Sequence, residues 1–365
     1  MGIKAFFKKR PSAPQRPAPA GAPPIHFLSI GEHMNILFFA VMAAVGGVIF
    51  VNGWTDAPTA IATCVTSGAM RERRAALMAA VCNLLGIAVS GLVRPAVAMT
   101  VKGMVHLPED RADVALAALL CALASVGLWA VTAWWFGIPT SESHGLLAGL
   151  TGAALAVGGV DSVDGGAWLR VILGLLISIS GGLLAGFLCS AVLSVVIQRR
   201  GRRDDAMKWG LRIGAAAMAF LHGAQDGQKF LGIWLLAMTL QATESIPISL
   251  LIFLCAVFMG AGTLVGGGRI IRTLGEKLVK VGTEEGIAAD AGAAACLALL
   301  TLFGIPVSTT HTKTAALMGV GAAGRERMDW RVAGRMVGAW LLTFPVCGGA
   351  AYLGMRVILH LLGCY

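Results

Sequence analysis

Two aspartates stand inside apolar stretches of this sequence, Asp56 in NGWTDAPTAI and Asp226 in HGAQDGQKFLG. An uncompensated charge in hydrocarbon costs at least about 2.5–3.5 kcal/mol, so each carboxylate is either functional or satisfied by hydrogen bonds between helices. Residues that would interrupt a helix flank both aspartates, namely Gly53, Pro58, Gly223 and Gly227. An interrupted helix frees carbonyl groups that can bind a cation beside a carboxylate. The pattern therefore predicts that Asp56 and Asp226 bind a cation.

Two runs of hydroxyl residues each follow a Gly-Ile-Pro sequence, in GIPTSESHGLLAG and GIPVSTTHTKTAA. We expect Pro139 and Pro306 at the first position of a helix, where the missing N–H of proline costs nothing. The hydroxyls would then surround a helix N-terminus, which attracts an anion such as phosphate or sulfate. An ordinary helix cap explains one hydroxyl, but poorly explains three hydroxyls in each of the two runs. The candidate anion ligands are Thr140, Ser141, Ser143, Ser308, Thr309 and Thr310.

Two histidines and two lysines adjoin these motifs. His144 and His311 end the hydroxyl runs and would orient or gate the helix tips, or titrate, or only pack. Lys229 follows Asp226 by three residues, and Lys313 follows the second hydroxyl run. Either lysine would offset the charge of an anion or pair with a nearby aspartate.

The aspartate and hydroxyl motifs recur in the same order. Asp56 precedes His144 by 88 residues, and Asp226 precedes His311 by 85. A duplicated unit of about 170 residues explains both spacings.

The two copies differ at one position of the hydroxyl run. Glu142 stands where the other copy has Thr309, and it would be a cation ligand, a proton carrier or one half of a structural pair. Asp290 lies in IAADAGAAAC, has no counterpart in the first copy, and receives no role.

The composition is that of a multi-pass protein of the cell membrane. Of 365 residues, 57% are hydrophobic and only 13% charged, which is too few to cover a soluble core of this size. Helices are expected, because lipid leaves unpaired backbone groups unsatisfied and no barrel pattern is present. The net charge of +10 is spread over the chain, so nucleic acid is not an expected partner. Stretches long enough to cross about 30 Å of hydrocarbon are 35–53, 75–93, 113–136, 169–198, 209–239, 247–268 and 333–362.

The loop charges indicate that the two copies have opposite orientations. The loop at 71–74 has three arginines, whereas its counterpart at 241–247 has no basic residue. The connection 159–168 has two acids and no base, whereas its counterpart at 324–331 has three arginines. Because basic loops stay cytoplasmic, the copies would form inverted repeats, a plan common among secondary transporters.

Four segments follow from these patterns. Residues 1–30 form a basic, proline-rich disordered arm that would touch anionic membrane lipid. Residues 31–198 form the first transmembrane repeat, 199–208 a basic cytoplasmic linker, and 209–365 the second repeat. The same orientation places the arm outside the cell, against the positive-inside rule, unless the chain makes an extra crossing near 27–53.

The motifs resemble those of the inorganic phosphate transporter (PiT) family, above all HGAQDGQK (His222 to Lys229) and PVSTTH (Pro306 to His311). The resemblance implies an all-α integral membrane protein of two inverted repeats, each with a broken helix and a re-entrant hairpin. It also implies phosphate symport with Na⁺ or H⁺, with no other cofactor or metal and a possible homodimer. The implied cation ligands are Asp56, Asp226, Thr55 and Glu142, and the implied phosphate ligands are Gln225, Ser141, Ser143, Ser308, Thr309 and Thr310.

The sequence departs from the family pattern at Thr59 and Gln225, where the family often has Asn, and at PTSESH in the first half. A changed ligand set would affect the coupling ion first. A sulfate permease of the same fold and an anion channel are the alternatives. An intramembrane hydrolase is disfavoured, because no serine has a dedicated base. We therefore expect no enzymatic activity, and transport by alternating access around one site near the membrane midplane.

Overall fold

Helices account for all of the regular structure in the part of the chain that the structure describes. A computed structural model describes residues 30–201, 204–241, 246–278, 281–323 and 328–363. Within these ranges the only β-type pairing is one isolated bridge between Val105 and Val163. The all-α prediction is confirmed. The predicted arm lies outside the described residues, apart from the start of the first helix.

Seven candidate membrane spans occur within these ranges, and six of them match predicted stretches. The seventh, Thr283–Leu302, was missed because it contains Glu284, Glu285 and Asp290. The predicted crossing at 209–239 is not among the candidate spans, and in this stretch two α-helices are joined by the π-helical turn Gly223–Gly227. The count and composition of the spans establish a multi-pass membrane protein.

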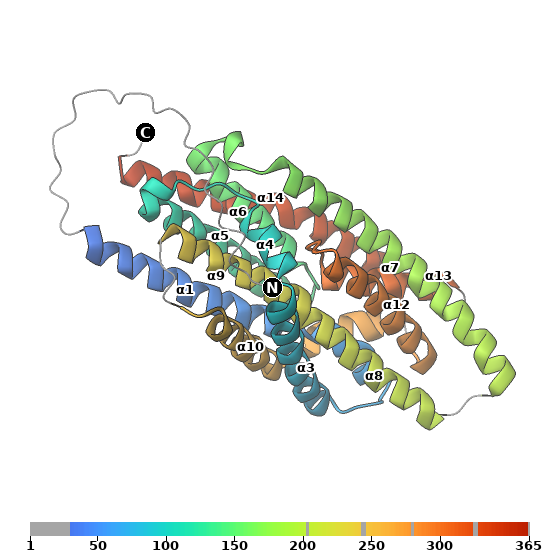
Figure 1. The fold of residues 1–365 in the computed structure, drawn as a ribbon. Helices are drawn as coiled ribbons and strands as arrows, with labels where there is room; N and C mark the ends of the chain where they lie inside the picture. The colour runs from blue at the N-terminus through green and yellow to red at the C-terminus, as the bar shows by residue number, and fades with distance from the viewer. Residues whose placement is uncertain (1–29, 202–203, 242–245, 279–280, 324–327, 364–365) are drawn as a thin grey trace, which may run out of the picture.

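Between residues 30 and 200 the described part of the chain forms seven α-helices (Figure 1). Their order is a long helix with a short continuation, a crossing helix, a short helix, a hairpin pair and a long closing helix. They are α1 (Ile30–Thr55), α2 (Pro58–Thr66), α3 (Glu72–Val93), α4 (Ala96–Lys102), α5 (Ala112–Trp135), α6 (Glu142–Gly158) and α7 (Gly165–Arg200). Short 3₁₀ turns precede α5 and α7, at Glu109–Arg111 and Val160–Ser162.

The second half repeats this order. Its helices are α8 (Asp204–His222), α9 (Gln228–Leu240), α10 (Ile248–Val265), α11 (Gly268–Arg272), α12 (Thr283–Leu302), α13 (Thr309–Ala323) and α14 (Trp330–Leu361). The π-helical segment η4 (Gly223–Gly227) joins α8 to α9, and a second one, η5 (Thr273–Leu278), follows α11.

The packing between the halves is reciprocal. The hairpin α5–α6 packs on α14, and the hairpin α12–α13 packs on α7; α1 packs on α10, and α8 on α3. In Figure 1, α7 and α14 lie in the same bundle and run in opposite directions. This is the arrangement expected of inverted repeats, although the inversion relative to a membrane stays a prediction.

Two clusters of buried apolar side chains form the core. One lies among α1, α5, α9 and α10, with Val45, Leu119 and Ile233 inside it. The other lies among α2, α8, α11 and α12, with Leu211 and Leu297 inside it. Apolar side chains also cover much of the outer surface, as a lipid environment requires.

Each hairpin turns at a glycine with a positive φ, Gly137 at 66° and Gly304 at 67°. Only glycine adopts this conformation without strain, and it ends α5 and α12 in the same way. The predicted place of Pro139 and Pro306 at a helix start is wrong. Both lie in segments without regular secondary structure, and α6 and α13 begin three residues later, at Glu142 and Thr309.

The first predicted helix interruption is present, whereas at the second the chain stays helical through a π-helical turn. The helix breaks between Thr55 and Pro58, and Pro58 occupies the start of α2, where proline is favoured. Gly53 does not cause the break, since it lies inside α1, where a Cβ would be 2.1 Å from the Met259 carbonyl oxygen of α10. In the second half, Asp226 lies in the wider π-helical turn η4, which joins α8 to α9 without a break.

Candidate functional site

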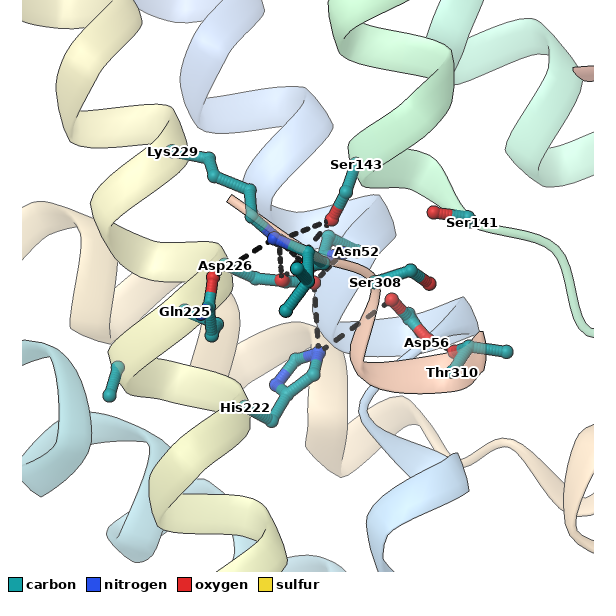
Figure 2. A network of polar contacts seen from close by, with 12 residues as sticks. Asn52, Asp56, Ser141, Ser143, His222, Gln225, Asp226, Lys229, Ser308 and Thr310 are labelled. Carbon is teal, nitrogen blue, oxygen red and sulfur yellow. Dashed lines mark hydrogen bonds and ion pairs between the residues drawn. The ribbon is translucent and has the colours of Figure 1, made fainter. Parts of the chain in front are cut away.

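Side chains from four segments meet in one buried cluster (Figure 2). The segments are the end of α1, the start of α6, the turn η4 and the start of α13. Each polar side chain that forms the cluster is at most 6% exposed. Each half of the chain contributes two of these segments, so no single stretch of sequence contains the whole cluster.

Asp226 is the best-connected acid of this cluster. Its Oδ1 lies 2.6 Å from Lys229 Nζ and accepts a hydrogen bond of 3.3 Å from the Ser143 hydroxyl. Its Oδ2 accepts one of 3.2 Å from the Asn52 amide and lies 3.4 Å from His222 Nε2. The negative charge of Asp226 is therefore compensated by a cationic side chain inside the protein.

Lys229 connects Asp226 to both hairpins. Its ammonium group donates to the Ser143 hydroxyl of the first hairpin at 2.6 Å and to the Val307 carbonyl oxygen of the second at 2.5 Å. These two contacts and the bond to Asp226 use all three of its donors.

Asp56 and Glu142 lack such compensation. Thr310 donates a hydrogen bond to Asp56 Oδ1, and Thr55 donates one to Glu142 Oε1. No salt bridge joins either acid to a lysine or arginine of the described residues. The other oxygens, Asp56 Oδ2 and Glu142 Oε2, are buried without a partner, as is Asn52 Oδ1. Three acceptor oxygens thus lie near the C-terminal end of α1 with no donor, in an arrangement suited to a cation.

His222 lies between the two aspartates. Its Nε2 is 3.9 Å from Asp56 Oδ2, while Nδ1 is 3.1 Å from Asn83 Oδ1. Ligand atoms of Asp56, His222 and Asp226 all lie within 4.8 Å of one another, close enough to share one ion. In the neutral tautomer that donates Nδ1–H to the Asn83 oxygen, Nε2 is an acceptor.

The two hairpin helices direct their N-termini into the same cluster. Ser141 and Ser308 cap α6 and α13, because their hydroxyl oxygens accept from the backbone N–H of His144 and His311, each at 3.1 Å. Both serines therefore have the ordinary capping role that was the alternative to anion binding. The Thr309 hydroxyl, by contrast, is buried and has no partner.

Gln225 is turned toward the second hairpin. Its amide donates to the Thr301 hydroxyl at 3.0 Å and to the Ile305 carbonyl at 3.2 Å, and its oxygen accepts from the Val307 N–H at 3.5 Å. These bonds occupy the side chain, so Gln225 holds the hairpin turn in place in this conformation.

His144 and His311 form a stack between the two hairpins. Their ring centroids are 4.7 Å apart, His311 lies 3.9 Å from the Trp340 ring, and His144 lies 5.2 Å from Phe344. Their ring nitrogens have no hydrogen-bond partner. The stack thus packs the two hairpin tips on α14, and neither histidine forms an ion pair with the two aspartates.

Asp290 and Lys313 form a second buried ion pair, away from the first cluster of contacts. The Lys313 ammonium contacts Asp290 Oδ1, and the Thr63 hydroxyl lies 3.0 Å from both Asp290 oxygens. All three side chains are 0% exposed. The pair connects α2, α12 and α13 through Asp290, the residue to which the sequence assigned no role.

Asn52 and His222 are the members of the site that sequence reasoning missed. Each lies four residues before an aspartate of the repeat, Asn52 before Asp56 and His222 before Asp226. On a helix this spacing puts both residues of a pair on one face. Aligning the two copies residue by residue would have exposed the recurrence.

Comparison with known proteins assigns the chain to a family. A family model described as "Phosphate transporter family" matches residues 52–214 and 198–351. The chain belongs to the phosphate transporter family. A "Probable low-affinity inorganic phosphate transporter" of Mycobacterium bovis is 36% identical over 349 residues, covering 91% of this chain and 80% of that protein. A protein of Bacillus subtilis with the same name is 32% identical over 322 residues, covering 85% and 94%.

The fold of this phosphate transporter family member also occurs in a solved structure. "The sodium-dependent phosphate transporter" aligns with a TM-score of 0.79 and 21% identity, covering 88% of this chain and 99% of that one. The family relationship confirms the resemblance predicted from the motifs. It also agrees with the expectation that the chain is not an enzyme, since the matched relatives are named as transporters.

Proposed function

We propose that this member of the phosphate transporter family carries inorganic phosphate across the cell membrane in symport with a cation, H⁺ or Na⁺, by alternating access. One observation carries the proposal. Asp56 of the first half bonds Thr310 of the second hairpin, and Asp226 of the second half bonds Ser143 of the first hairpin. Each half thus bonds the other across one buried centre, and relative motion of the halves would make and break both contacts.

In this proposal the coupling cation binds beside Asp56 and Glu142. Asp226 already has Lys229 as a counter-charge, whereas the other two acids have none among the described residues. The partnerless oxygens of Asn52, Asp56 and Glu142 form a donor set that suits Na⁺ and a proton alike. Thr55 supports the set through its bond to Glu142.

Phosphate would bind at the N-termini of α6 and α13. Backbone N–H groups at a helix start favour an anion, and the Thr309 hydroxyl is an unused donor at this place. Ser143, Thr310 and Lys229 would supply further donors once phosphate replaces their present contacts. Ser141 and Ser308 would shape the helix tips as caps.

Coupling follows from the cost of burying unpaired carboxylates. Closing the hairpins on Asp56 and Glu142 without a cation leaves two buried charges uncompensated, which is expensive in a membrane interior. A bound cation removes that cost and favours the closed state. The transporter that holds phosphate without the cation would therefore close less readily than the fully loaded one, which prevents phosphate transport without the cation.

Uptake of radiolabelled phosphate into proteoliposomes tests the proposal. Na⁺ and proton gradients are imposed separately, and sulfate is added as a competitor. We expect one gradient to drive accumulation above equilibrium, with little inhibition by sulfate. Uptake that ignores both gradients would identify a channel or a uniporter, and strong inhibition by sulfate would identify a less selective anion carrier.

A further inference from the structure

A basic pocket lies at one end of the bundle, where the loop before α3 meets the first turns of α8. Its volume is about 640 Å³, and three of the residues that line it are arginines, while none is acidic. The arginines are Arg71, Arg74 and Arg212. None of these residues belongs to the buried transport site.

Two contacts fix Arg212 in this pocket. Its Nε donates to the Ala69 carbonyl oxygen at 3.0 Å, and its Cζ lies 5.0 Å from the centre of the Trp209 ring. The nearest acid in the sequence is Glu72. Its carboxylate lies beside Gly268, which does not line the pocket, since a Cβ added to that glycine would be 3.2 Å from Glu72 Oε1. The pocket therefore has a net positive charge with one preoriented guanidinium.

The surroundings of the pocket are those of a membrane boundary. The candidate span Glu72–Val93 begins at its edge. Outward-facing apolar side chains continue from the pocket along α8 and α3, with Trp209 61%, Ile213 66% and Leu77 57% exposed. Tryptophan is enriched at the boundary between headgroups and hydrocarbon, and arginines at the same depth lie level with lipid phosphates.

We propose that this pocket binds the headgroup of an anionic phospholipid such as phosphatidylglycerol. The lipid phosphate contacts Arg71, Arg74 and Arg212, while the acyl chains lie along Leu77 and Ile213. A soluble anion would use the arginines but gain nothing from the adjoining apolar surface. The basic loops at 71–74 and 199–208 are those expected on the cytoplasmic side, where anionic lipids attract arginine.

Native mass spectrometry of the full chain, released from mixed vesicles of phosphatidylcholine and phosphatidylglycerol, tests the proposal. We expect the wild type to retain phosphatidylglycerol in preference to phosphatidylcholine. The double variant Arg71→Gln/Arg74→Gln should bind phosphatidylglycerol about 30-fold more weakly, given about 1 kcal/mol for each arginine near an anionic surface.

A matched control removes the same charge outside the pocket. The variant Arg73→Gln/Arg94→Gln replaces two exposed arginines, one at each end of α3, that do not line the cavity. It should retain phosphatidylglycerol like the wild type. The proposal would be overturned if both double variants lost retained phosphatidylglycerol equally, or if the wild type showed no preference for phosphatidylglycerol over phosphatidylcholine.

A competition experiment separates lipid from free phosphate. Inorganic phosphate added to the wild-type protein in the same vesicles should leave retained phosphatidylglycerol unchanged. Displacement of the lipid by inorganic phosphate would instead identify the pocket as a site for a soluble anion. Because lipid retention is measured without transport, the result does not depend on the proposed transport function.

Discussion

Lys229 Nζ lies 2.6 Å from Asp226 Oδ1, and both side chains are 1% exposed. The same ammonium group also contacts Ser143 of one hairpin and the Val307 carbonyl of the other. The pair therefore does more than balance charge, because it holds both hairpins against η4. It also changes the role expected of Asp226, whose charge is compensated by a lysine without a transported cation.

Replacing Lys229 by Met should destabilise the protein strongly. The substitution leaves the Asp226 carboxylate buried and unpaired, and breaking one side of such a pair costs about 3–5 kcal/mol. Thermal unfolding in detergent, followed by tryptophan fluorescence, should show a clear fall in melting temperature. The double variant Lys229→Met/Asp226→Asn should regain most of the lost melting temperature, because no unpaired buried charge remains.

The exposed Lys208 of α8 provides the control for that experiment. Lys208→Met should leave the melting temperature within the error of the wild type. If Lys229→Met were as stable as Lys208→Met, the Asp226 carboxylate would not depend on the lysine for its counter-charge.

Replacing Asp56 by Asn should uncouple transport. The proposed cation site keeps its other oxygens but loses the carboxylate whose Oδ2 has no partner. Accumulation of phosphate against its gradient in proteoliposomes should therefore be lost, while the protein remains folded and inserted. Asp161→Asn, in the exposed connection between α6 and α7, should transport like the wild type. Accumulation at the wild-type rate in Asp56→Asn would remove Asp56 from the cation site.

The sequence predicted the parts of the site better than their contacts. The repeated motifs located both aspartates, both hydroxyl runs and the helix break before Pro58, because glycine, proline and buried acids constrain the backbone locally. The partner of each residue is set by packing between the two halves. Asp56 with Thr310 and Asp226 with Ser143 are separated by 254 and 83 residues, and no local pattern specifies such a pairing.

Two errors have a common physical origin. The span at 283–302 was missed because its acids lower the apparent hydropathy, yet Asp290 is satisfied by Lys313 and Thr63 from other helices. Pro139 was assigned to a helix start, yet the capping serine two residues later determines where α6 begins. In both cases a contact with other residues, and not the residue itself, decided the structure.

Replacing Thr309 by Val should weaken phosphate binding without affecting stability. Its hydroxyl is buried, has no protein partner and lies at the start of α13, so its removal breaks no existing hydrogen bond. One hydrogen bond to a charged ligand is worth about 1.5–3 kcal/mol, which corresponds to a rise of about 10- to 100-fold in the phosphate concentration for half-maximal uptake.

The neighbouring Thr312 is the matched control for Thr309. It is equally buried, but its hydroxyl donates to the Ser308 carbonyl oxygen at 2.9 Å within the same helix. Thr312→Val should leave half-saturation unchanged. An unchanged half-saturation in Thr309→Val as well would mean that this hydroxyl does not contact the substrate.

The second buried pair predicts a structural role for Asp290. Lys313→Met alone should lower the melting temperature, because Asp290 is 0% exposed and would keep only the Thr63 hydroxyl as a partner. Lys313→Met/Asp290→Asn should restore stability, since the Asn side chain can still accept from Thr63. We also expect this double variant to retain phosphate uptake, because neither residue contacts the proposed ligands. Restored stability with lost uptake would instead show that the charges of this pair take part in transport, and it would place a second functional site between α2 and the second hairpin.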